Sequence, residues 1–227
     1  MGTVQILDTT TKYPITLIGE RAGVCWGADI TDAAKNYKRG WDCITSGHGR
    51  TLEFVNVEMV LDGYSTRVIR EWYTHIGGAP TRLQASTRYI DYANFEYVTP
   101  QSIRKADPVA LAIYEKRMED LQDSIVSLIE EYGIPREDAA MLLPLGMTTR
   151  VVDRRNLRNL IDMSRQRMCN RAYWEFRELF NDILDALIEY SDEWKAIATT
   201  QMKPKCDVLG YCPEKNGCGK YPKEGER

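Results

Sequence analysis

The feature that most limits the fold is a change of hydrophobic periodicity near Ala106. From Val109 to Tyr132, apolar residues recur at intervals of three and four, which is typical of an amphipathic helix, and Gly133 ends the pattern. The run Leu52–Leu61 is instead rich in β-branched and aromatic residues in partial alternation, which predicts a strand. The chain is therefore expected to have an α/β fold of the mixed α+β type, with a helical second half.

The other expected elements are short segments on either side of this change. They are strands at Val4–Leu7, Ile15–Gly19 and Arg88–Val98, a loop at Gly77–Gln84, and helices at Ser65–His75, Pro135–Leu143, Thr149–Met168 and Ala172–Ala198. We expect residues 1–200 to form one domain. Residues 201–227 are rich in Cys, Pro and Gly and are expected to form a loop-rich tail.

Charge and hydropathy narrow the classes of partner. The net charge of −3 argues against binding nucleic acid through bulk positive charge. No uncharged apolar stretch approaches the roughly 18 residues that a membrane span needs, and the first residues carry no signal-peptide pattern. We therefore expect a cytoplasmic protein with neither a nucleic acid nor a membrane as its partner.

Two polar clusters could bind an anion. The loop Gly77–Gln84 leads to Ser86, Thr87 and Arg88, whose hydroxyl and guanidinium groups suit a phosphate dianion. Further on, the expected helix would align four arginines on one face: Arg150, Arg154, Arg158 and Arg165. The alternative for the first cluster is a solvated loop whose arginines pair with carboxylates. The alternative for the second is a solvated helix face or a subunit contact.

Four of the six cysteines could form a metal site. The tail spaces three of them as C-x5-C-x5-C, which is a weak metal signal because it contains no C-x2-C pair. Together with one cysteine beside the arginine cluster they would supply four soft ligands for zinc: Cys169, Cys206, Cys212 and Cys218. Free thiols in ordinary surroundings are the alternative.

The loop after residue 73 resembles the signature of flavin-dependent thymidylate synthases, RHRxxSxNExSxR. His75 matches the His of the signature, Gln84 falls at its Glu, and Ser86-Thr87-Arg88 matches its closing S-x-R. Upstream, His48-Gly-Arg-Thr-Leu-Glu53 resembles the family's HxTxxE segment. The similarity therefore begins before the loop and includes it.

A second block of similarity follows without gaps. It consists of Pro135-Arg136-Glu137, Ala139, Leu143-Pro144-Leu145, Thr149-Arg150, Asn156, Arg158, Leu160, Arg167 and Trp174-Glu175. The resemblance thus covers roughly residues 20–180. The chain departs from the family pattern at Thr74 and Ile76, where the signature has arginines, by two residues inserted between His75 and Ser86, and at Ala140, where an arginine is expected.

The resemblance implies an enzyme with a flavin-dependent thymidylate synthase-like catalytic domain over residues 1–200. Such an enzyme transfers a one-carbon unit from 5,10-methylenetetrahydrofolate to C5 of dUMP, with FAD as redox carrier and NADPH as reductant, and forms dTMP. The family implies a homotetramer whose active sites lie at subunit interfaces. In such enzymes the cofactor carries the chemistry, and the protein supplies binding, orientation and electrostatics.

The resemblance also implies site residues. The expected catalytic residues are Arg167 and Ser86. The residues expected to bind dUMP are Glu71, Gln84, Ser86, Thr87, Arg88 and Arg167. Those expected to bind FAD are His48, Arg50, Glu53, His75, Ile76, Asn156 and Asp162. Cys25, Cys43 and Cys169 lie in no recognisable nucleophile motif, so no thiolate attack on the pyrimidine is expected.

Two other functions stay open on the sequence. The altered loop is compatible with the same scaffold acting as a nucleotide hydroxymethylase or on another pyrimidine nucleotide. From a different class, the chain could be a non-catalytic helical protein whose arginine face binds an anion or a protein partner.

Overall fold

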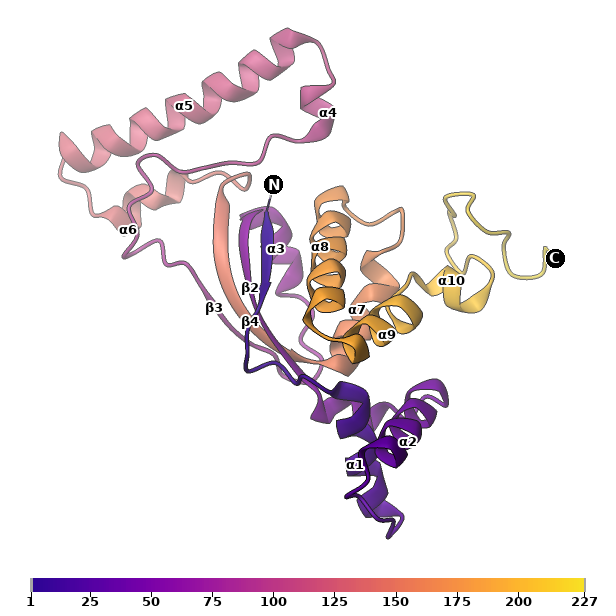
Figure 1. Ribbon diagram of the computed structural model, residues 1–227. Coiled ribbons are helices and arrows are strands. Elements are labelled where there is room, and N and C mark those ends of the chain that lie inside the picture. The colour runs from indigo at the N-terminus through magenta and orange to yellow at the C-terminus, as the bar shows by residue number, and fades with distance from the viewer. Residues whose placement is uncertain (1, 227) are drawn as a thin grey trace. The chain divides into compact units, whose positions relative to one another are not determined.

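The chain forms ten α-helices, two 3-10 helices and four strands among residues 2–226, which are the residues that the computed structural model describes (Figure 1). In chain order these elements are β1 (Thr3–Ile6), α1 (Pro14–Cys25), α2 (Ala33–Thr45), η1 (Gly49–Phe54), β2 (Asn56–Ser65), α3 (Thr66–Trp72), β3 (Thr81–Gln84), α4 (Gln101–Arg104), α5 (Pro108–Glu130), α6 (Arg136–Ala139), η2 (Ala140–Leu142), β4 (Thr148–Asn156), α7 (Leu157–Arg167), α8 (Trp174–Tyr190), α9 (Asp192–Gln201) and α10 (Lys205–Leu209). The mixed α+β class predicted from the periodicity is confirmed.

The four strands form one antiparallel sheet in the order β1-β2-β4-β3. The chain divides into two compact units, each assembled from separate stretches of sequence. The first unit contains Leu61–Tyr73 and Leu83–Val151, and the second contains Val4–Val60, Thr74–Arg82 and the chain from Val152 onward. Strands β2 and β4 each contribute residues to both units.

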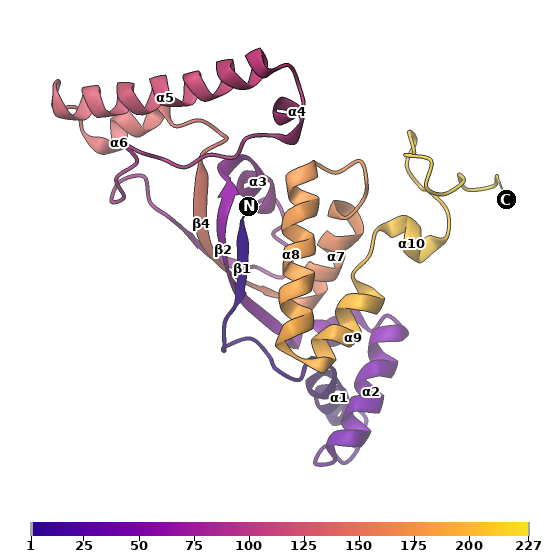
Figure 2. The same cartoon turned by 45° about the horizontal axis from the view of Figure 1, so that its top comes forward.

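In the second unit, α1 and α2 pack side by side as a helical hairpin (Figures 1 and 2). Their backbones approach closely at two glycines. A Cβ on Gly19 would lie 1.7 Å from the carbonyl oxygen of Asn36, and one on Gly40 would lie 1.9 Å from that of Ile15. Any larger residue at either position would force the helices apart.

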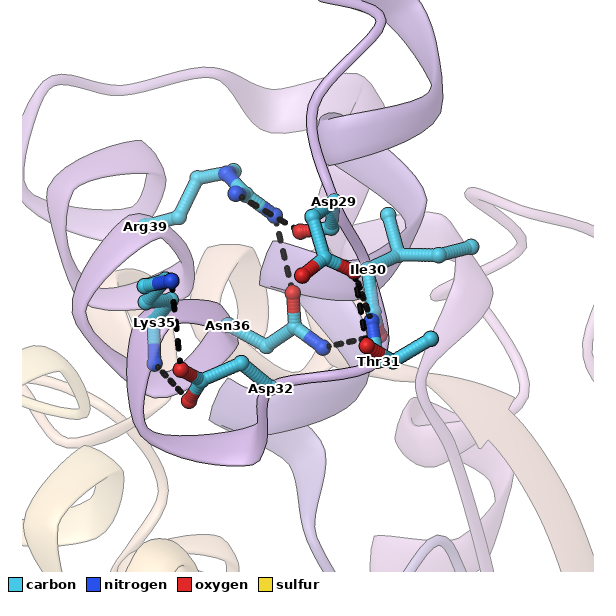
Figure 3. Close-up of polar contacts among 7 residues, drawn as sticks. All are labelled: Asp29, Ile30, Thr31, Asp32, Lys35, Asn36 and Arg39. Carbon is cyan, nitrogen blue, oxygen red and sulfur yellow. Dashed lines mark hydrogen bonds and ion pairs between the residues drawn. The ribbon is translucent and has the colours of Figure 1, made fainter.

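The turn between these helices is held by side-chain hydrogen bonds (Figure 3). Asp32 begins α2 by accepting a hydrogen bond from the backbone N–H of Lys35 at 3.0 Å, as an N-cap carboxylate should. The guanidinium of Arg39 donates to Asn36 Oδ1 at 2.8 Å, and Asn36 donates to the carbonyl of Ile30 at 2.7 Å. These bonds fix the turn to the helix that follows it.

The core of the second unit is built on α8. Its fully buried residues Phe176, Phe180, Ile183 and Leu187 follow one another at intervals of three and four, so they lie on one face of the helix. Burying each such side chain contributes about 1.5–3 kcal/mol. At the start of α9, Glu193 accepts hydrogen bonds from the first backbone N–H groups of α1, at 2.7 Å from Ile15. A carboxylate at that position stabilises the helix N-terminus.

The first unit has its own core, beneath the long helix α5. Met118 and Ile125, seven residues apart on α5, are buried against Phe95, Ala139 and Met147. The predicted helix from Val109 to Tyr132 is confirmed as α5, which ends before Gly133 at a φ of +65°.

Four further predictions of elements are confirmed wholly or in part. The expected strand at Val4–Leu7 is β1, and the expected helix at Ser65–His75 is α3. The expected strand at Leu52–Leu61 begins later, at Asn56, because η1 occupies the residues before it. The helix expected after Pro135 is a short one, α6, continued by η2.

Two predicted strands were wrong. Ile15–Gly19 lies in α1, where Pro14 occupies the first turn and Glu193, distant in sequence, caps the N-terminus, so tertiary contacts override the β-branched composition. The segment Arg88–Val98 contains turns and one isolated bridge, Tyr97 with Met147, because no neighbouring strand pairs with the rest of it. Conversely, the end of the predicted loop Gly77–Gln84 forms β3.

Two predicted helices were too long. Only the second half of Thr149–Met168 is helical, as α7, because the residues before Asn156 form β4 with alternating burial. The expected helix Ala172–Ala198 is interrupted at Ser191, an extended residue whose hydroxyl caps α9 by accepting from the N–H of Trp194 at 3.3 Å.

The tail after residue 200 contains the short helix α10 and an isolated bridge between Cys212 and Lys223. The division into a domain over residues 1–200 and a tail over 201–227 stays a prediction. No helix among residues 2–226 combines the length and the apolar composition that a membrane span requires.

Candidate functional site

His75 is the centre of a polar cluster in the second unit. Its Nε2 atom accepts a hydrogen bond of 2.9 Å from Nε of Arg167, which is the last residue of α7. Phe176 of α8 lies edge-on to the imidazole at a centroid distance of 5.9 Å, and the Arg167 guanidinium lies 4.8 Å from the centre of the same ring. Two helices, α7 and α8, therefore fix the orientation of one histidine.

The imidazole of His75 is held in its neutral form. Burial, followed by the positive charges of Arg167 and Arg155, lowers the pKa of His75 from 6.5 to about 4. Because Nε2 accepts a hydrogen bond, the single proton of the neutral ring belongs on Nδ1. At neutral pH the ring can therefore offer a donor on Nδ1 to a ligand.

This pKa predicts a pH dependence of stability. As the pH falls through 6.5 the unfolded chain binds a proton at this histidine, whereas the folded chain binds it only near 4. His75 therefore lowers the free energy of unfolding progressively between these two values, and contributes no such loss above them. Urea unfolding across this pH range should show a shallower loss in His75→Gln than in the parent. Parallel curves would contradict the assigned pKa, and His48→Gln is the control.

The loop after His75 packs against the first turn of α7. Gly78 has a φ of +73°, and a Cβ there would lie 2.1 Å from Nδ2 of Asn156. Asn156 is also the N-cap of α7, since its Oδ1 accepts from the N–H of Asn159 at 2.9 Å. A Cβ on Gly77 would lie 3.0 Å from Nδ2 of Asn159. Both amide side chains thus face the glycine pair.

The predicted FAD residues before β2 also adjoin α7. Glu53 of η1 accepts a hydrogen bond of 2.6 Å from Nη1 of Arg158, and about half of each side chain is exposed. Nδ1 of His48 lies 2.8 Å from the hydroxyl of Ser46. The structure thereby places Glu53 and Arg158 together, within the same unit as His75 and Asn156.

The remaining predicted FAD residues are on the surface. Ile76 is 69% exposed, and Arg50 is exposed at the start of η1. Asp162 of α7 pairs with Arg165 at 3.5 Å, one turn along the helix. Within residues 2–226, the side chains of these three form no hydrogen bond or ion pair with His75, so their assignment to a cofactor stays a prediction.

The predicted dUMP residues divide between the two units. Five of them belong to the first unit: Glu71, Gln84, Ser86, Thr87 and Arg88. Arg167 belongs to the second. Within the first unit, the Ser86 hydroxyl accepts from the backbone N–H of Arg88 at 3.2 Å, and Gln84 donates to the hydroxyl of Thr149 at 3.2 Å.

Arg88 is accessible to an anion. Its Nε donates to Glu137 at 2.7 Å, but its side chain is 64% exposed. Such a surface ion pair contributes at most about 1 kcal/mol, so a phosphate can replace the carboxylate at little cost. The residue types at this turn fit the anion site that the sequence predicted.

The predicted helical stripe of arginines was wrong. Arg150 and Arg154 belong to β4, not to a helix, and only Arg158 and Arg165 lie on α7. Arg150 pairs with Asp62 of β2 at 3.0 Å. The four arginines are therefore divided between a strand and a helix and do not form one helical stripe.

Sequence reasoning missed the most deeply buried charges. Asp153 and Arg155 of β4 form an ion pair with no exposed side-chain surface. They lie two residues apart, so both side chains point to the same face of the strand. The sequence offers no clear signal for this pair, because charged and apolar residues do not alternate in this segment, although their burial does.

The four cysteines predicted to bind zinc line one pocket of about 530 Å³. Burial and the neighbouring Asp207 raise the pKa of the Cys206 thiol, whereas a backbone hydrogen bond at Lys220 lowers that of Cys218. Within residues 2–226, no three His, Cys, Asp or Glu side chains are arranged to hold a metal ion. The geometry therefore does not support the predicted zinc site.

Comparison with known proteins identifies similar sequences. The family described as thymidylate synthase complementing protein matches residues 6–190. The flavin-dependent thymidylate synthase of Nitratidesulfovibrio vulgaris is 32% identical over 188 residues, which cover 79% of this chain and 74% of that protein. The protein of the same name from Pyrococcus furiosus is 32% identical over 177 residues, covering 75% and 70%.

A solved structure has a similar fold. The crystal structure of Thymidylate Synthase X from Helicobacter pylori with FAD and dUMP aligns with a TM-score of 0.64. The alignment covers 84% of this chain and 95% of that one, at 19% sequence identity.

Proposed function

The chain belongs to the family of flavin-dependent thymidylate synthases, and from this premise we propose that it converts dUMP to dTMP with FAD as redox cofactor. The one-carbon donor is 5,10-methylenetetrahydrofolate and the reductant is NADPH. The observation that carries the proposal is the family match over residues 6–190, which includes both His75 and Arg167.

The residues around His75 fit a flavin. A neutral imidazole beside the apolar ring of Phe176 suits an uncharged heteroaromatic ring. The half-exposed guanidinium of Arg158 suits a phosphate. The residues that would hold FAD are His48, Arg50, Glu53, His75, Ile76, Asn156 and Asp162, and we add Arg158 because it pairs with Glu53. FAD, when bound, supplies the hydride chemistry, and the protein orients the reacting groups.

The residues proposed to bind dUMP have two separate roles, one toward the phosphate and one toward the base. Ser86, Thr87 and Arg88 bind the phosphate, while Glu71 and Gln84 position the nucleotide. Arg167 donates to the edge of the uracil and stabilises negative charge that develops on the ring. The reaction needs no cysteine nucleophile, which agrees with Cys43, whose pKa is raised by burial.

Replacing Arg88 should weaken nucleotide binding. Losing one charge-assisted hydrogen bond costs about 1.5–3 kcal/mol, so Arg88→Ala should bind dUMP about 10- to 150-fold more weakly. Isothermal titration of the FAD-loaded protein measures the change. Arg117→Ala, an exposed arginine of α5 in the same unit, is the control and should bind like the parent. Equal affinity in Arg88→Ala would remove this residue from the site.

We propose a homotetramer with active sites at subunit interfaces. Large apolar side chains of the first unit are exposed, including Val109 and Ile113 of α5 and Met141 of η2, which supports a subunit contact there. Sedimentation equilibrium should give four times the mass of the chain. A monomer at concentrations that support turnover would contradict this assembly.

Titration with FAD tests the cofactor directly. The protein, purified without added flavin, should quench FAD fluorescence on binding. A folded protein that never quenches it would leave the family membership standing but remove the cofactor from the proposal.

A further inference from the structure

The buried ion pair of β4 is connected through Asn159 to the loop that carries His75. Nε and Nη2 of Arg155 donate to the two carboxylate oxygens of Asp153 at 2.6 and 2.8 Å. Both side chains are fully buried. Taking two charges out of water is costly, and a pair of this kind is weak support for stability by itself. Stability alone therefore does not explain why these two charges are buried.

Arg155 also fixes the orientation of an amide. Its Nη1 donates to Oδ1 of Asn159 at 2.7 Å. Because a guanidinium can only donate, the amide must present its oxygen to Arg155 and its NH₂ group elsewhere. That NH₂ group lies against Gly77, where a Cβ would be 3.0 Å from Nδ2. Arg155 thus determines which end of Asn159 contacts the loop.

The same guanidinium acts on His75 electrostatically. The charged groups that act on the imidazole are Arg167 from α7 and Arg155 from β4, and Phe176 from α8 adds an uncharged ring. The immediate neighbours of His75, Thr74 and Ile76, carry no charge. Positive charge next to this histidine therefore comes from β4 and α7, not from its own loop.

We propose that Arg155 is a positioning residue of the flavin site, which holds the Gly77–Gly78 turn through Asn159 and keeps His75 where it accepts from Arg167. Its link to flavin rests on the proposed function. Its effect on His75 and on the turn belongs to the chain without any ligand, and can be measured there.

The first test is NMR of the chain without flavin. The chain has only two histidines, so His48→Gln assigns the His75 signal. In Asp153→Leu/Arg155→Met, which removes both charges, the hydrogen bond that His75 accepts from Arg167 should loosen, so the pKa of His75 should rise above 4, while burial and Arg167 keep it below 6.5. Amide hydrogen exchange at Gly77 and Gly78 should become faster. Arg117→Met/Asp120→Leu removes an exposed ion pair of α5 and should change neither.

A second variant keeps the ion pair and removes its link to the loop. Asn159→Ala should also speed exchange at Gly77 and Gly78. Adding it to the double variant should give no further increase, because both changes break one connection. Parental exchange in Asn159→Ala, or an unchanged His75 pKa in the folded double variant, would overturn the proposal.

Titration with FAD separates this inference from the proposed function. The double variant should bind FAD about tenfold more weakly or worse, the scale of losing an outer partner of a ligand-binding residue in metal sites. If the parent binds no FAD, the proposed cofactor fails while the NMR result stands. If parent and double variant bind FAD equally, the positioning role fails while the proposed function stands.

Discussion

Arg167→Ala is expected to lower turnover by about 100-fold or more, the scale of losing one preorganised donor of positive charge. In the folded chain this guanidinium is already oriented, by its 2.9 Å hydrogen bond to His75 and by the ring of Phe176 4.8 Å away. An interaction with charge that develops on the uracil grows toward the transition state, so kcat should fall more than dUMP affinity. Steady-state and single-turnover kinetics of the flavin-loaded variant measure both.

The control must show that turnover does not fall on loss of just any arginine of the second unit. Arg21 of α1 is half exposed, and within residues 2–226 it forms an ion pair with its neighbour Glu20 and no other. Arg21→Ala should therefore retain parental turnover. Cys25→Ser, Cys43→Ser and Cys169→Ser should each retain most activity. An active Arg167→Ala together with one inactive, folded, flavin-loaded cysteine variant would reject this role.

The largest expected effect on stability comes from separating the buried pair of β4. Arg155→Met leaves the carboxylate of Asp153 buried without its bidentate partner, and should lower the free energy of unfolding by about 3–5 kcal/mol. Asp153→Leu/Arg155→Met removes both charges and should recover most of this loss, since replacing a buried pair by apolar residues is often neutral. Urea unfolding of the ligand-free chain compares the three proteins.

A matched arginine on the surface gives the reference for this comparison. Arg117 pairs with Asp120 at 2.8 Å but is 74% exposed, so Arg117→Met should change stability by less than about 0.5 kcal/mol. If Arg155→Met were as mild, or the double variant no better than the single one, the ion pair would not behave as a buried unit.

The sequence pattern predicted best those elements that are determined by residues within the element itself. Helix α5 has a long amphipathic period followed by Gly133, so the prediction of Val109–Tyr132 lies close to its observed bounds, Pro108–Glu130. The bounds of helix α1 did not follow, because the three β-branched residues of Ile15–Gly19 predict a strand. The contact that caps this helix comes from Glu193, far along the chain. Contacts between distant residues decide such segments, and composition cannot reveal them.

For the candidate site, too, only some of the residues could be predicted from the sequence. Family resemblance predicted His75 and Asn156, which the structure brings to one loop and one helix start, within a single unit. It could not predict Arg155, because the charges of this segment do not alternate along the sequence, and the alternating burial of β4 appears only in the structure. The neutral state of His75 also needed the structure, since burial is the first cause of its lowered pKa.

The most direct measurement is the product formed from dUMP. The protein is incubated with dUMP, 5,10-methylenetetrahydrofolate, FAD and NADPH, and the nucleotide is identified by mass spectrometry. The account predicts dTMP, formed only when FAD and the reductant are both present. A hydroxymethylated nucleotide, or unchanged dUMP with a folded and flavin-loaded protein, would contradict it.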